Sequence, residues 1–100
     1  MAIDLTIINQ QYKENYIDIL GENLSALRAK AGFTQEEVAT MVGVSRQTYY
    51  SIETGKRNMT WTLCFALILL FDTNLDTHNM LRGIGAYPKE IIMKMNGNDL

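Results

Sequence analysis

Apolar residues recur along most of the chain at the three- and four-residue spacing that is typical of α-helices. The first such run comprises Ile8, Tyr12, Tyr16 and Ile19. It predicts a helix over residues 9–19, although residues 3–8 could equally be extended. The second run comprises Leu24, Leu27 and Ala31. Because Gly21 is expected to break the chain between the two runs, we predict a separate helix over residues 20–31 that ends at Gly32.

Two short helices joined by a tight turn are predicted next. The hydroxyl of Thr34 can accept from the amide of Glu37, whose carboxylate can reach back to the amide of Thr34, so this pair predicts a capping box. Gly43 can adopt the positive φ that lets the chain turn within very few residues. Ser45 is a natural N-cap for the next helix, which Gly55 closes. The inward faces of the two helices comprise Val38, Ala39, Val42, Tyr49 and Ile52.

Three further helices are predicted from the remaining caps and breaks. Thr60 is an N-cap for a helix over residues 61–71, and a shorter helix is expected over residues 75–82, after a turn. Pro88 suits the first turn of a final helix over residues 88–95. We therefore expect an all-α fold.

Composition limits the chain to one small globular unit. One hundred residues are the size of a single domain, and 47% hydrophobic with 20% charged residues argue against disorder. Cys64 is the single cysteine, and the N-terminus lacks the pattern of a secretory signal, so we expect a cytoplasmic location. The longest apolar run, residues 63–71, is far below the roughly 20 residues that span a bilayer, so no membrane association is expected.

The overall charge is unusual for a protein that binds nucleic acid, because the net charge is −2 and the pI is near 5.2. The distribution of the charges matters more than their sum. Within residues 45–58, Arg46, Lys56 and Arg57 stand against Glu53 alone. A local positive patch can therefore exist on this acidic chain, and nucleic-acid binding through it should weaken with salt.

The segment between Thr34 and Glu53 has the order of a helix-turn-helix: a capped helix, a glycine turn and a second capped helix, with the small Ala39 where the helices approach. A closer likeness is carried by Leu24, Leu27-Arg28, Gly32-Phe33-Thr34-Gln35-Glu36-Glu37-Val38-Ala39, Gly43-Val44-Ser45 and Ile52-Glu53-Thr54-Gly55-Lys56-Arg57. In these positions the chain resembles the Cro/phage-repressor, or XRE-type, helix-turn-helix family over about residues 20–80.

The resemblance implies both a fold and a function. The implied fold is a compact five-helix repressor-like DNA-binding domain over residues 20–82, with an extra N-terminal helix within residues 1–19 and a tail with a short helix in residues 83–100. The implied function is that of a transcriptional regulator, expected to be a repressor, which binds double-stranded DNA sequence-specifically. No cofactor, metal or small-molecule ligand can be inferred.

The resemblance also implies which residues contact DNA. The helix over residues 45–53 would enter the major groove, while the helix over residues 35–42 lies across the backbone. The implied base-reading residues are Arg46, Gln47 and Ser51. Arg46 matches the O6 and N7 atoms of guanine, and Gln47 could read adenine. The implied phosphate contacts are Gln35, Thr48, Tyr50, Lys56 and Arg57, of which Tyr50 could touch a sugar instead.

Two residues with charged side chains are expected to stabilise the fold and not to contact DNA. The resemblance implies that Arg28 and Glu53 form an internal salt bridge, which ties the helix before the helix-turn-helix to the end of the recognition helix. Tyr49 is expected in the core.

The predicted helix over residues 61–71 is apolar on nearly every side. A surface helix keeps a polar face, so this helix must be covered on both sides. The N-terminal helix, residues 84–96 and a second copy of the chain could each cover it. We favour a homodimer to which the terminal segments contribute, because two subunits can engage two half-sites about 34 Å apart.

Other functions find less support in the sequence. An enzyme is not expected, because the chain has one histidine, one cysteine, no metal-ligand spacing and no glycine-rich phosphate loop. His78 is expected at a helix end and Cys64 in the core. The competing interpretation is a protein-binding module on the same fold, antitoxin-like or an adaptor, which the acidic pI favours. Arg46 and Gln47 favour DNA, because a partner-binding helix would rather expose aliphatic side chains there.

Overall fold

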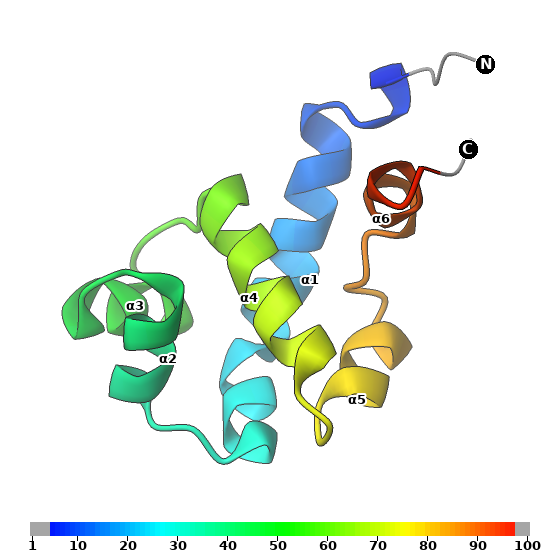
Figure 1. The fold of residues 1–100 in the computed structure, drawn as a ribbon. Helices are drawn as coiled ribbons and strands as arrows, with labels where there is room; N and C mark the ends of the chain where they lie inside the picture. The colour runs from blue at the N-terminus through cyan, green and yellow to red at the C-terminus, as the bar shows by residue number, and fades with distance from the viewer. Residues whose placement is uncertain (1–4, 98–100) are drawn as a thin grey trace.

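The computed structural model describes residues 5–97 of the chain. Within this range every regular element is helical (Figure 1). The elements are the 3-10 helix η1 (Leu5–Ile7) and the α-helices α1 (Gln10–Ala31), α2 (Gln35–Val42), α3 (Arg46–Glu53), α4 (Trp61–Thr73), α5 (His78–Gly83) and α6 (Lys89–Met95). The predicted all-α fold class is confirmed, although the first two predicted α-helices are a single helix, α1.

The predicted break at Gly21 is wrong, because α1 runs through this residue without interruption. Leu20, Leu24 and Leu27 are fully buried, so the apolar stripe of α1 continues across the glycine. A glycine inside a helix costs only about 1 kcal/mol relative to alanine, whereas burying one leucine side chain contributes about 1.5–3 kcal/mol. Burial therefore decides the conformation, and the domain boundary predicted after residue 19 falls inside one continuous helix.

The start of α1 is fixed by Asn9, whose side-chain oxygen accepts from the amide of Tyr12 at 2.9 Å. The helix therefore begins at Gln10, one residue later than predicted. Before it, Leu5–Ile7 forms a 3-10 helix rather than an extended segment. Residues 1–4, which include part of the segment that could have been extended, lie outside the described residues.

The α2 and α3 helices form the predicted pair of capped helices. The amide of Glu37 donates to Thr34 Oγ1 at 3.1 Å, and the amide of Thr34 donates to Glu37 Oε1 at 2.8 Å, which confirms the capping box. Gly43 ends α2 with a φ of 81°, in the left-handed region. Ser45 Oγ then accepts from the amide of Thr48 at 3.0 Å and caps α3. Both caps and the glycine turn are thus present as predicted.

The core lies where α1 and α4 pack together, with α2 and α3 on one side of them and α5 against the end of α4 (Figure 1). Its buried apolar residues are Leu20, Leu24, Leu27, Val38, Ala39, Tyr49, Ile52, Met59, Leu63, Cys64, Leu67, Ile68, Phe71, Leu81 and Ala86. Tyr49 and Ile52 attach α3 to this core. The opposite side of α3 therefore faces solvent.

The apolar α4 is covered on most of its sides but not on all of them. The side chains that are buried against its neighbours are Leu63, Cys64, Leu67, Ile68 and Phe71. On another side Leu69 is 60% exposed, and Trp61 and Phe65 are half-buried, with their ring centroids 5.7 Å apart. Packing against α1 and α5 thus supplies much of the required cover, and a strip that includes these three residues stays open.

The helix predicted over residues 75–82 begins three residues later, as α5, because Asn74 organises a turn before it. Asn74 Oδ1 accepts from the amides of Asp76 and Thr77 at 2.9 and 3.2 Å. The buried hydroxyl of Thr77 donates to the carbonyl of Phe71 at 2.7 Å, which holds this turn against the end of α4.

The C-terminal helix α6 starts directly after Pro88, which is buried, and matches the predicted range of 88–95 to within one residue. The hydroxyl of Tyr12 in α1 donates to Glu90 Oε2 at 2.9 Å, which attaches α6 to the N-terminal half of α1. Among residues 5–97, no helix is long and apolar enough to cross a membrane.

Candidate nucleic-acid interface

Burial divides α3 into two faces. Tyr49 is fully buried and Ile52 nearly so, because both pack into the core. Arg46, Gln47 and Tyr50 are exposed, whereas Thr48 and Ser51 are half-buried at the edges. Arginine, glutamine and serine side chains can hydrogen-bond the edges of bases, and the first turn of α3 presents two of them to solvent.

A hollow on the surface joins this face of α3 to the start of α2. It is lined by Gln35, Arg46, Gln47 and Tyr50. Gln35 is the first residue of α2, where backbone amides and the helix dipole favour an anion. The structure thus brings a predicted phosphate contact next to both predicted first-turn base readers.

The loop after α3 is fixed to the end of that helix by its own backbone. Gly55 adopts a φ of 79°, which turns the chain back. The amides of Lys56 and Arg57 then both donate to the carbonyl of Ser51, at 2.9 and 3.1 Å. The Thr54 hydroxyl adds a hydrogen bond to the carbonyl of Tyr50 at 2.8 Å. Two cationic residues are therefore attached firmly beside α3.

The side chains of these two cationic residues lie on either side of α3. Lys56 Nζ is 5.8 Å from the centroid of the Tyr50 ring, and Arg57 Nη1 is 3.5 Å from Thr48 Oγ1. Residues two apart on a helix are separated by about 200° around its axis. The exposed face of α3 is thus flanked by a positive charge near Tyr50 and another near Thr48.

Arg28 and Glu53 form an ion pair that fixes the orientation of α3. Arg28 Nε and Nη2 donate to the Glu53 carboxylate at 2.9 Å each, and Arg28 Nη1 donates to the carbonyl of Phe33 at 3.0 Å. The Glu53 side chain is 5% exposed and that of Arg28 is 22% exposed. One guanidinium therefore joins the end of α1, the loop before α2 and the end of α3.

The ionisation of Glu53 reflects this setting. Burial opposes its negative charge, but the hydrogen bonds from Arg28 and the positive charge of that guanidinium outweigh burial and hold the pKa of Glu53 below its ordinary value. Burial and the neighbouring Glu53 raise the pKa of Tyr49. At neutral pH Glu53 is therefore ionised and Tyr49 is neutral. This fits residues that stabilise the fold and do not contact DNA.

His78 and Cys64 lie at a helix end and in the core, as the sequence predicted. The His78 ring bonds through Nδ1 to the carbonyl of Asp72 at 2.6 Å, at the start of α5. Burial raises the pKa of the Cys64 thiol to about 12, so it is protonated at neutral pH. Within residues 5–97, no three His, Cys, Asp or Glu side chains gather in a group that could hold a metal ion.

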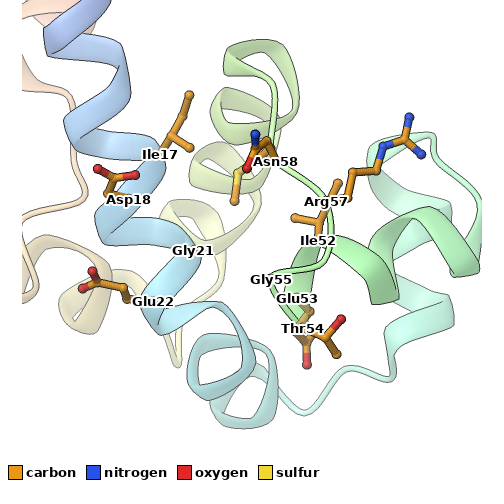
Figure 2. A pocket seen from close by; sticks show the side chains of 11 residues that line it. Ile17, Asp18, Gly21, Glu22, Ile52, Glu53, Thr54, Gly55, Arg57 and Asn58 are labelled. Atoms are coloured by element: carbon orange, nitrogen blue, oxygen red, sulfur yellow. The ribbon is translucent and has the colours of Figure 1, made fainter.

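Sequence reasoning missed a second hollow, between α1 and the loop after α3 (Figure 2). Asp18 and Glu22, one turn apart on α1, contribute acidic side chains to its lining. Arg57 also lines it, but its side chain points away from α1 in Figure 2. This hollow joins residues more than thirty positions apart, so only a knowledge of how α1 packs on the loop could have predicted it.

Comparison with known proteins agrees with this geometry. The model of the family described as helix-turn-helix matches residues 24–77. Two uncharacterised HTH-type transcriptional regulators of Archaeoglobus fulgidus are similar to the chain. The first is 41% identical over 49 residues, which are 49% of this chain and 70% of that protein. The second is 36% identical over 53 residues, which are 53% of this chain and 75% of that protein.

A third relative, an uncharacterised HTH-type transcriptional regulator of Sinorhizobium fredii, is 45% identical over 42 residues, which are 42% of this chain and 54% of that protein. No solved structure matches the chain at a significant level. The family match spans α2, α3 and α4 and includes the capping box, the glycine turn and the Arg28–Glu53 pair. The chain belongs to the Cro/phage-repressor, or XRE-type, helix-turn-helix family.

Proposed function

We propose that this protein binds double-stranded DNA at a specific sequence through α3 and thereby regulates transcription in the cytoplasm, as a repressor. The observation that carries the proposal is the exposed first turn of α3, where Arg46 and Gln47 face solvent while Tyr49 and Ile52 fix the helix to the core. The names of the relatives, all HTH-type transcriptional regulators, support the same function.

In this proposal α3 lies in the major groove with its N-terminal end toward the bases, and α2 lies across the backbone. Arg46 donates two hydrogen bonds to the O6 and N7 atoms of a guanine, and Gln47 pairs in the same bidentate manner with an adenine. Ser51 lies one turn after Gln47 and contacts a neighbouring base edge.

The phosphate contacts flank these base contacts. Gln35 binds a phosphate at the start of α2, while Lys56 and Arg57 bind phosphates on either side of α3. The Thr48 hydroxyl accepts from Ser45 Oγ at 2.9 Å, so its own proton can be donated to a phosphate oxygen. Such contacts fix the register of the protein on DNA. Each neutralised phosphate makes the slope of the logarithm of the binding constant against the logarithm of the salt concentration more negative by about 0.9.

We further propose a homodimer that forms through the open strip of α4. Leu69 is the most exposed apolar residue of that helix, at 60%. No residue from Thr60 to Phe71 is charged, so a two-fold contact between two copies of this strip brings no like charges together. A dimer presents two copies of α3, which suits a two-fold symmetric DNA site.

A selection from a pool of randomised duplexes tests the proposed function. We expect the protein to enrich one sequence with two-fold symmetry and to bind it more weakly as salt is raised. The competing function, a protein-binding module of the antitoxin or adaptor kind, is favoured by the pI near 5.2. Failure to enrich any sequence at low salt would reject DNA recognition in favour of that module.

A further inference from the structure

Tyr50 is a large aromatic residue on the exposed face of α3, which is the proposed DNA-binding face. Its side chain is 44% exposed, although most aromatic surface in a folded protein is buried. It is four residues after Arg46 and three after Gln47, so all three side chains lie on one side of α3. Together with Gln35 they line the same hollow. The ring thus shares its surroundings with both first-turn base readers.

The position of this ring is restrained by the loop after α3. Lys56 Nζ lies 5.8 Å from the ring centroid, within the range of a cation–π contact. The carbonyl of Tyr50 accepts from the amide of Thr54 at 3.0 Å and from the Thr54 hydroxyl at 2.8 Å. The backbone of Tyr50 is therefore fixed by hydrogen bonds, and a cation lies beside its ring.

A phosphate or sugar contact, which the sequence assigned to Tyr50, would use the hydroxyl and would give the apolar surface of the ring no contact with DNA. The ring offers an apolar surface beside side chains that are proposed to read base edges. In the major groove, the apolar group that projects from a base is the C5-methyl of thymine, which apolar and aromatic side chains contact. The ring of Tyr50 therefore offers a methyl group an apolar surface next to the two proposed base-reading residues.

We infer that the Tyr50 ring contacts the C5-methyl of one thymine in each half-site and so makes Tyr50 a specificity-determining residue. This inference rests on the proposed function. Arg46 and Gln47 read hydrogen-bonding groups, and Tyr50 adds a position at which a T·A pair is preferred because its methyl group leaves water against the ring.

The test replaces each thymine of the selected duplex, one at a time, with deoxyuridine, which lacks only the methyl group. For the unmodified protein we expect about fourfold weaker binding at one thymine of each half-site, the effect of exposing one methyl-sized group. Tyr50→Ala should lose this discrimination and bind the two duplexes equally. Tyr50→Phe, which keeps the ring and removes the hydroxyl, should retain it, and thermal unfolding of each variant checks the fold.

Several results would overturn the inference. A flat deoxyuridine scan with the unmodified protein would do so, as would a fourfold loss that persists in Tyr50→Ala. Loss of the deoxyuridine discrimination in Tyr50→Phe would also overturn it, because the hydroxyl and not the ring would then carry the preference. Replacing cytosines with 5-methylcytosine is a second arm, in which tighter binding without any loss at a thymine would overturn the thymine assignment. If no sequence is enriched at all, the proposed function fails and this inference with it.

Discussion

Arg28, on α1, connects three parts of the structure through its guanidinium group. The group donates to Glu53 in α3 and to the carbonyl of Phe33 in the loop before α2. The resemblance to the family predicted the pair with Glu53. The contact with Phe33 was not predictable, because it depends on how the loop after Gly32 folds over the end of α1. This partly buried ion pair therefore adds to the core contacts of Tyr49 and Ile52 in orienting α3 relative to α1.

Arg28→Ala should lower the free energy of unfolding by about 3 kcal/mol, because the Glu53 carboxylate is then left buried without its partner. Chemical denaturation measures this change. Lys30→Ala is the matched control, an exposed cation in the same turn of α1, and should change stability by less than about 1 kcal/mol. Equal effects of the two substitutions would show that the pair has no special energetic importance.

The pH dependence of stability should also depend on Glu53. Its pKa is lower in the folded state than its ordinary value of 4.5, so its ionised form stabilises the fold above about pH 4.5, and this contribution is lost as the pH falls through the lowered pKa. The difference in unfolding free energy between the unmodified protein and Glu53→Gln should therefore shrink as the pH is lowered from 6 to 3. A difference that stays constant across this range would contradict this account of Glu53.

At the scale of elements, local signals predicted the helix-turn-helix well because its ends are fixed locally. Thr34, Gly43 and Ser45 form their caps and turn from neighbouring atoms alone. The predicted break at Gly21 failed because a stripe of leucines buried against other helices outweighs the cost of one glycine. The start of α5 was predicted three residues too early because a local interaction was overlooked. Asn74 accepts hydrogen bonds that form a turn, and the spacing of apolar residues does not reveal this turn.

Gly21→Ala should raise the free energy of unfolding by about 0.5–1 kcal/mol, because alanine favours an uninterrupted helix. A Cβ at this position meets only Met59 Cε at 4.0 Å, an ordinary contact. Gly43→Ala is the matched control, because its φ of 81° strains any side chain, and it should destabilise the protein. Destabilisation by both substitutions would indicate that α1 needs flexibility at Gly21.

At the scale of the whole molecule, the apolar α4 connects α2 and α3 to the terminal segments. The sequence predicted that α4 needs cover but left open which part supplies it. Packing against α1 and α5 covers most sides, while α6 is attached to α1 through Tyr12 and Glu90. The strip around Leu69 remains, and it is the surface on which we propose that a second copy packs.

Leu69→Glu should convert the proposed dimer into a folded monomer, because two carboxylates would then meet at an apolar contact. Sedimentation at micromolar concentration measures the mass, and circular dichroism measures the fold. Leu75→Glu is the control, because Leu75 is 94% exposed and lies outside α4, and it should leave the mass unchanged. If the unmodified protein is a monomer both alone and on DNA, the dimer is excluded.

The central claim, that the first turn of α3 reads DNA sequence, is tested most directly by the base preferences of Arg46→Ala. Its affinity is measured for the selected duplex and for every single base-pair change. We expect about 5- to 150-fold weaker binding to the selected duplex and loss of preference at one guanine. Unfolding should be unchanged, and Lys94→Ala, an exposed cation on α6, should bind with the same preferences as the unmodified protein. An Arg46→Ala variant that keeps its preference at every position would contradict the claim.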